Sequence, residues 1–220
     1  MKILVLSDVE DPFLWDYYVP GRLNEYDLIL SAGDLKAEYL RFLVTMARVP
    51  VLYVHGNHDT SYEVDPPEGC DCIENRLIDY KGLRILGLGG CPRYKNAKHQ
   101  YTEQQMTRRI RKLRHALKKA GGVDIVLTHA APKGCEDLED YAHRGFDCFL
   151  SLIGQWKPKF LVHGHVHLNY GAERLHRIGD TRVINAYQKY VIEIEPEPRA
   201  LNRKPRSALF SARRDPFETY

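Results

Sequence analysis

The sequence predicts an α/β protein built around a mainly parallel sheet. Short apolar runs at residues 3–6, 28–30 and 51–54 are each followed by a polar turn, as expected of buried strands. Between the second and third runs, residues 37–47 carry apolar side chains at helical spacing. This strand–helix–strand order is typical of a parallel sheet.

The middle of the chain predicts a hairpin and a long helix. Residues 65–72 are rich in Pro, Gly and Asp and indicate a loop. Apolar runs at 77–80 and 83–88 flank Lys81-Gly82, which favours a hairpin. A glycine-rich loop then reaches about residue 100. A helix is expected from residue 102 to 120, with Thr102 as its cap.

The second half repeats the pattern of a strand followed by a polar turn. Residues 125–127 run into Thr128-His129, and residues 160–162 run into a His-Gly-His-Val-His segment. Residues 141–154 between them are predicted to be helical. Residues 182–184 and 190–194 are predicted to be antiparallel strands that close the domain.

Composition excludes a disordered or membrane-spanning chain. The 220 residues are 44% hydrophobic and 28% charged, as in ordinary globular proteins. No apolar run approaches the roughly 18 residues that a membrane helix needs. The apolar start reaches Ser7-Asp8 too soon for a signal peptide, and the five cysteines are an odd number. These features predict a cytoplasmic protein with reduced thiols and no membrane association.

The net charge of +3 is unevenly placed. Residues 196–220 contain six basic and three acidic residues, so residues 1–195 are neutral overall. We therefore expect one domain over 1–195 and a basic, proline-containing tail over 196–220. The neutral domain gives no bulk-charge argument for nucleic acid. Apolar residues in the tail allow docking on the domain or on a second subunit, which would make a homo-oligomer.

Polar residues of the metal-ligand type follow five predicted strands, and they are Asp8, Glu10, Asp34, Asn57, His58, His129, His165 and His167. Sites in parallel α/β sheets form at the carboxyl ends of strands, so these residues should converge. Asp, Asn and His are ligands for borderline divalent metals. They are too many for one tetrahedral ion and suit two ions that share a carboxylate.

The motifs that carry these residues resemble those of the calcineurin-like metallophosphoesterase superfamily. They read Asp8-Val9-Glu10, Gly33-Asp34, Gly56-Asn57-His58-Asp59, Thr128-His129 and Gly164-His165-Val166-His167. The resemblance extends from residue 3 to about 194, so 1–195 would be a metallophosphoesterase domain. It implies a four-layer α/β/β/α sandwich with mixed sheets and a two-metal site on one edge.

The resemblance also implies a role for each motif residue. Asp34 would bridge the two metals, Asp8 and His167 would hold the first, and Asn57, His129 and His165 would hold the second. His58 would face the substrate phosphate instead of binding metal. Glu10 departs from the pattern, which has histidine there. A glutamate ligand would make the first position richer in oxygen and favour Mn²⁺, with Mg²⁺, Fe²⁺ and Zn²⁺ as alternatives.

The activity that follows from the resemblance is metal-dependent hydrolysis of a phosphate mono- or diester. A hydroxide that bridges the two ions would attack phosphorus, and His58 would assist at the phosphate or the leaving group. Arg93 and Tyr94, in the glycine-rich loop, are candidates for binding a small phosphoester substrate.

Two other functions remain open from the sequence. The chain could be a non-catalytic scaffold, since the family includes binding proteins, and Glu10 would then mark a decaying site. It could also be a nuclease-like phosphodiesterase, which only the basic residues of the long helix and the tail suggest. A solvated helix face is the simpler explanation of those helix charges.

Overall fold

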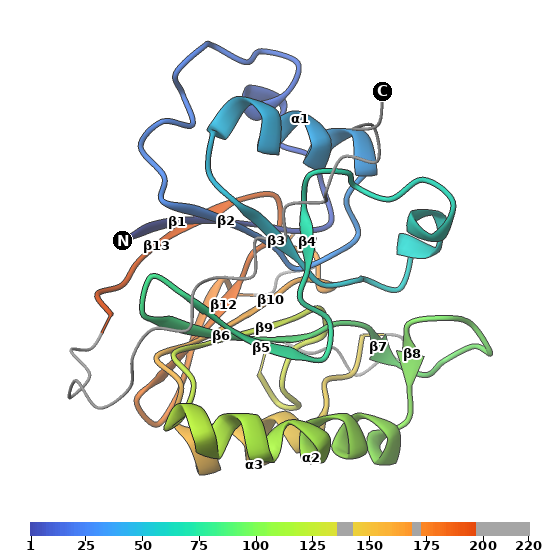
Figure 1. Ribbon diagram of the computed structural model, residues 1–220. Helices are drawn as coiled ribbons and strands as arrows, with labels where there is room; N and C mark the ends of the chain where they lie inside the picture. The colour runs from blue at the N-terminus through green and yellow to red at the C-terminus, as the bar shows by residue number, and fades with distance from the viewer. Residues whose placement is uncertain (136–142, 169–172, 197–220) are drawn as a thin grey trace, which may run out of the picture.

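The computed structural model describes residues 1–135, 143–168 and 173–196, and Figure 1 shows their arrangement. Two sheets face each other. One helix covers the outer face of the first sheet, and two helices cover the outer face of the second. The predicted four-layer α/β/β/α sandwich with mixed sheets is confirmed. The predicted tail, residues 196–220, lies outside the described residues except for Pro196.

The first sheet has the strand order β13-β1-β2-β3-β4. Its strands are β1 (Lys2–Leu6), β2 (Leu28–Ser31), β3 (Val51–Tyr53), β4 (Asp71–Cys72) and β13 (Tyr190–Glu193). Strands β1 to β4 run parallel, whereas β13 pairs antiparallel with β1. The short strand β4 lies within the segment predicted to be a loop.

The second sheet has the order β11-β12-β10-β9-β6-β5. Its strands are β5 (Arg76–Tyr80), β6 (Leu83–Leu88), β9 (Ile125–Thr128), β10 (Phe160–His163), β11 (Leu175–Ile178) and β12 (Thr181–Asn185). The four central strands are parallel, and an antiparallel strand closes each side. The predicted hairpin is β5–β6. Strand β11 was not predicted. Residues 182–184 were predicted to be an antiparallel strand, and β12 does pair antiparallel with β11, but it runs parallel to β10 on its other side.

Three helices complete the outer layers: α1 (Ala37–Ala47), α2 (Glu103–Ala120) and α3 (Asp147–Trp156). Thr102 caps α2 as predicted, through a reciprocal pair of hydrogen bonds with Gln105. Short 3₁₀ turns, η1 (Pro12–Leu14) and η2 (Asp59–Glu63), and a two-stranded ribbon, β7 (Cys91–Pro92) with β8 (Gln100–Tyr101), lie in the connections. No helix of the described residues has the length and hydrophobicity needed to cross a bilayer.

Helix α3 begins later than the predicted start at residue 141. Residues 136–142 lie outside the described part of the chain, but Phe146 is described and its backbone is extended. The Phe146 N–H donates to the carbonyl of Ala131, and the Lys133 N–H donates to the carbonyl of Phe146. This pairing with the segment after β9 holds Phe146 out of the helix, so α3 starts at Asp147.

Alternating side chains of the strands supply two different apolar layers. In β1, Ile3 and Val5 point into the core between the sheets, whereas Leu4 and Leu6 pack beneath α1. A third layer joins the second sheet to α2 and α3. Strands buried on both faces explain the continuous apolar runs of the sequence. In β1, β2, β3, β9 and β10, polar side chains are therefore found only near the strand ends.

One basic residue of α2 departs from the predicted solvated face. The Arg109 side chain is 11% exposed and pairs with Glu74, and its guanidinium lies 4.1 Å from the centroid of the Tyr101 ring. The other basic residues of this helix are exposed, namely Arg108, Arg111, Lys112, Arg114, Lys118 and Lys119. Arg109 therefore holds the helix to the strand connections.

Candidate metal centre

Segments that follow five parallel strands meet at one edge of the sandwich. Strands β1, β2 and β3 belong to the first sheet, and β9 and β10 belong to the second. Residues distant in the chain thereby become neighbours. The backbone N–H of His165, for example, lies 3.0 Å from both carboxylate oxygens of Asp8, across 157 positions of sequence.

Asp34, His129 and His165 form a buried metal-binding group. Each offers one ligand atom, and these atoms all lie within 4.8 Å of one another. His129 is fully buried and His165 is 6% exposed. One carboxylate and two imidazoles are a donor set that divalent transition metals accept. The structure thus brings together three of the residues that the sequence analysis selected as ligands.

Hydrogen bonds orient the ring of His129 so that Nε2 faces the centre. Its Nδ1 lies 2.8 Å from the carbonyl oxygen of Ala32, which can only accept, so Nδ1 carries a proton. Its Nε2 lies 3.0 Å from Oδ1 of Asn57 and 3.3 Å from Oδ2 of Asp34. A backbone acceptor behind the ring is the arrangement that fixes histidine ligands of metals.

The pKa values show that this centre favours a positive charge. Burial lowers the pKa of His129, but attraction to Asp34 and a hydrogen bond with it outweigh burial and bring the value to about 9. Burial raises the pKa of Asp34, but attraction to His129 and hydrogen bonds lower it to about 2. A cation among these atoms would supply the charge that a proton on His129 otherwise provides, so the donor set fits a divalent metal ion.

Asp8 lies beside this group and connects the two sheets. Burial raises its pKa, and attraction to His129 opposes the rise. Asp8, Asp34 and His165 all have positive φ angles, of 65°, 58° and 70°. Such conformations are uncommon outside glycine and gather at functional sites.

Asn57 links the centre to the loop between β7 and β8. Its side-chain oxygen faces His129, and its Nδ2 donates to the hydroxyl of Tyr94 at 3.3 Å. The hydroxyl of Tyr94 therefore lies beside the centre, and its role in substrate binding stays a prediction. The guanidinium of Arg93 donates to Oε1 of Gln105 at the start of α2, and its role in substrate binding stays a prediction.

His58 is exposed and lies next to the centre. Its backbone N–H donates to Oδ1 of Asp34 at 2.8 Å. The ring is not part of the metal-binding group among the described residues. This placement leaves the imidazole open to a bound molecule, and its catalytic role stays a prediction.

Glu10 and His167 do not belong to the group of three among the described residues. Oε1 of Glu10 accepts the backbone N–H of Lys36, the residue that precedes α1, at 3.0 Å. The ring centroid of His167 lies 4.8 Å from that of Tyr187. The structure does not bring either residue into the group that it describes, and their roles as ligands of a first metal stay predictions.

Two residues close to the centre were not selected from the sequence. Oδ2 of Asp59 accepts the backbone N–H groups of Asp34 at 2.9 Å and Gly56 at 2.7 Å, so it fixes both motif loops. Burial and the nearby charge of Asp34 raise the pKa of Asp59 to about 6. The ring centroid of His143 lies 5.1 Å from that of His165. Asp59 ends a motif and was thus findable, whereas no pattern in the sequence marks His143.

Gly56 is required because no side chain fits at its position. A Cβ atom there would lie 2.0 Å from Oδ1 of Asp34. We expect Gly56→Ala to displace Asp34, to reduce metal binding and to lower the free energy of unfolding by about 1–3 kcal/mol. Metal analysis and thermal unfolding measure both effects.

Gly154→Ala is the matched control for this substitution. Gly154 lies in α3, and a Cβ atom there would meet nothing within 4 Å. Alanine should stabilise that helix by roughly 0.5–1 kcal/mol and leave metal binding unchanged. Normal metal content in Gly56→Ala would contradict the role given to this close approach.

Comparisons with known proteins agree with the fold and the centre. Residues 1–186 match the calcineurin-like phosphoesterase superfamily domain. An uncharacterized protein from Haemophilus influenzae is 27% identical in an alignment of length 172 that covers 64% of this chain and 73% of that protein.

Two solved structures share the fold. TT1561 of Thermus thermophilus has a TM-score of 0.55 at 17% identity, over 84% of this chain and 88% of that one. GAP50, the anchor in the inner membrane complex of Plasmodium, has a TM-score of 0.51 at 13% identity, over 84% and 70%. The domain match covers most of the sequence, including every motif of the centre. The chain belongs to the calcineurin-like phosphoesterase superfamily.

Proposed function

We propose that this protein is a metal-dependent hydrolase of phosphate mono- or diesters. The observation that carries the proposal is the convergence of Asp34, His129 and His165 from three different strand ends. Family membership supports the same reaction class. When bound, divalent cations acidify a water molecule and neutralise phosphoryl oxygens, which allows attack on phosphorus at neutral pH.

The residues of this chain would prepare the site in distinct ways. His129 is held by Ala32 with Nε2 toward the centre. Asp59 fixes the backbone of Asp34, so the carboxylate keeps its direction. The exposed ring of His58 would donate a proton to the leaving oxygen or stabilise the charge that develops on the phosphoryl group. The hydroxyl of Tyr94, beside Asn57, would contact the substrate.

We further propose a centre for two ions, with Mn²⁺ preferred. Asp34 would be shared, and Asp8 with His167 would hold the first ion. Asp8 supports this role because it lies close enough to His129 and Asp34 for their charges to change its pKa. Carboxylate oxygens favour Mn²⁺ or Mg²⁺ over softer ions.

A substrate screen tests the reaction. Metal-stripped protein is assayed with aryl phosphate monoesters, aryl diesters, 2′,3′-cyclic nucleotides and a short oligonucleotide, before and after addition of Mn²⁺. We expect hydrolysis of at least one ester class only after the metal is added. Undiminished hydrolysis by the metal-free protein would refute metal dependence. No hydrolysis by the fully loaded protein would favour a scaffold.

The scaffold is a second candidate because of Glu10. Where the family pattern has a histidine, this chain has a carboxylate bound to the backbone N–H of Lys36. The first ion position would then lack a ligand. GAP50, which shares the fold, is an anchor. A chain that binds one ion or none, and hydrolyses no ester, would fit this alternative.

Glu10→Ala separates the structural role of Glu10 from a role in metal binding. The Lys36 N–H loses its acceptor, so we expect the free energy of unfolding to fall by about 0.5–2 kcal/mol, as for loss of a helix cap. Thermal unfolding measures this change. Metal analysis of the same variant shows whether Glu10 also ligates, because a ligand would take an equivalent of metal with it. Unchanged stability would contradict the role at the start of α1.

A further inference from the structure

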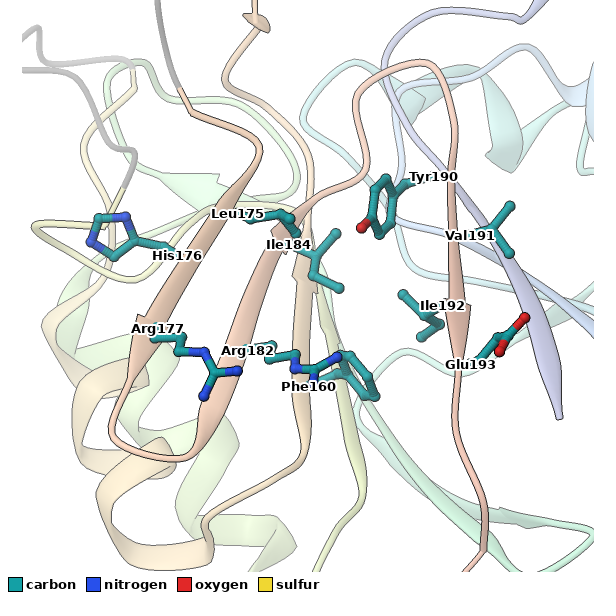
Figure 2. A pocket seen from close by; sticks show the side chains of 10 residues that line it. All are labelled: Phe160, Leu175, His176, Arg177, Arg182, Ile184, Tyr190, Val191, Ile192 and Glu193. Carbon is teal, nitrogen blue, oxygen red and sulfur yellow. The ribbon is translucent and has the colours of Figure 1, made fainter.

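A cleft of about 510 Å³ opens at the side of the sandwich, between β13 and the β11–β12 hairpin (Figure 2). β13 is the edge strand of the first sheet, and β11 is the edge strand of the second. The volume is within the range of about 300–1,000 Å³ that is typical of ligand clefts.

The floor of the cleft is formed by one end of the apolar core between the sheets. Phe160, Ile184 and Ile192 belong to that core, and Tyr190 packs against it. Leu175 lines the same cleft and is 50% exposed. Phe160, Ile184 and Ile192 are themselves buried, so half-exposed Leu175 and partly buried Tyr190 offer the apolar surface that an apolar group would cover.

The rim of the cleft carries two arginines that face each other. Arg177 and Arg182 are direct partners in the β11–β12 register. Both are exposed, and Figure 2 shows both guanidinium groups at the same side of the cleft. Neither forms an ion pair with a carboxylate among the described residues, although Glu193 lines the opposite wall. Like charges directly opposite one another are unfavourable, so this rim favours an anionic group.

The described chain ends beside the cleft. Glu193 lines it, and Glu193 to Glu195 also line an adjoining pocket that shares Phe160 and Arg182. Residues 197–220 follow, outside the described part of the chain. An occupant in this segment is covalently attached, so its effective concentration at the cleft is high.

We propose that the cleft binds the segment Asp215-Pro216-Phe217-Glu218 of the same chain. Phe217 supplies the apolar group for the floor, and Asp215 and Glu218 supply carboxylates for Arg177 and Arg182. Arginine and carboxylate form strong, directed hydrogen bonds. Pro216 fixes its own φ and restricts Asp215 to extended backbone, which reduces the entropy lost on docking.

Charge distinguishes this segment from the other apolar residues of the tail. Leu201 lies between Arg199 and Arg203, and Leu209-Phe210 lies between Arg206 and Arg213. The rim arginines would repel both. Residues 197–214 can extend over about 60 Å, so the linker easily reaches the cleft.

Fluorine NMR of the full chain tests the proposal, with para-fluorophenylalanine in place of Phe217. We expect a signal shifted from its position in the unfolded chain and protected from broadening by a soluble gadolinium chelate. The reversals Arg177→Glu and Arg182→Glu together should return the signal to the unfolded position. Adding Asp215→Lys and Glu218→Lys should restore the shift. A signal at the unfolded position in the parent chain would overturn the proposal.

Two controls complete the experiment. The reversals Arg203→Glu and Arg206→Glu change the net charge of the chain by the same amount as the rim reversals. They leave the docking segment intact, so the signal should stay shifted. With para-fluorophenylalanine in place of Phe210 instead, the signal should lie at its position in the unfolded chain. A shifted signal that survives the rim reversals would exclude this cleft. The signal could also lose its shift on dilution, with dimers seen in sedimentation. That result would overturn docking within one chain and indicate that the tail of a second copy occupies the cleft.

Discussion

Asp34→Asn is expected to abolish metal-dependent hydrolysis while the protein stays folded. Asparagine keeps the size of the side chain and an oxygen that can accept the His58 N–H. It removes the charge that draws a cation between His129 and His165. A bound cation can lower the pKa of its water from about 15.7 to about 7, so its loss costs many orders of magnitude in rate at neutral pH.

The measurement pairs metal analysis with hydrolysis of the best substrate from the screen. Asp16→Asn is the matched control, because Asp16 is exposed and lies outside the centre. It should leave metal content and rate unchanged. An Asp34→Asn protein that keeps its full metal content and rate would show that this carboxylate is dispensable. The centre would then have to be built on other residues.

His58→Ala is expected to lower turnover by about 10²–10⁴-fold, the usual cost of removing a general acid or base. The backbone N–H that bonds to Asp34 remains in alanine, so the carboxylate should keep its position. Metal content should therefore be unchanged. The exposed ring is the only part of His58 that the substitution removes, and the rate loss reports its contact with substrate.

Loss of a metal equivalent in His58→Ala would instead make His58 a ligand. His115→Ala is the control, since His115 is exposed on α2. It should leave turnover and metal content as they are. A substrate with a good leaving group gives a second test, because it needs less help from an acid. The rate loss should shrink for such a substrate if His58 protonates the leaving oxygen.

The architecture could be predicted from the sequence because the same pattern of apolar runs and polar turns marks both the strands and the site. Strands buried on both faces must be apolar throughout, so polar residues appear only after them, at the carboxyl ends where parallel strands place a site. Asp34 and His129 could therefore be selected from the order of residues alone. The helix that Thr102 caps could also be predicted, because the cap is formed by residues close together in the sequence.

Features that depend on contacts between distant segments could not be predicted from the sequence. The extended backbone of Phe146 reflects its pairing with Ala131 and Lys133, which no local pattern encodes. Glu10 was predicted to be a ligand because it occupies a motif position, yet its carboxylate accepts a hydrogen bond from the backbone at the start of α1. His143 approaches His165 only in the folded chain.

The span of the centre along the chain has a consequence for folding. His129 bonds to Ala32, 97 residues earlier, and His165 bonds to Asp8, 157 residues earlier. Asp34 comes from the first half of the chain and both histidines from the second, so the ligand set does not exist until the two sheets have docked. Contacts of such long range form slowly. A cation that binds only the native state adds stability by mass action, about 2.7 kcal/mol at a hundred times its dissociation constant. The supply of metal in the cell would then help decide what fraction of newly made chains stays folded.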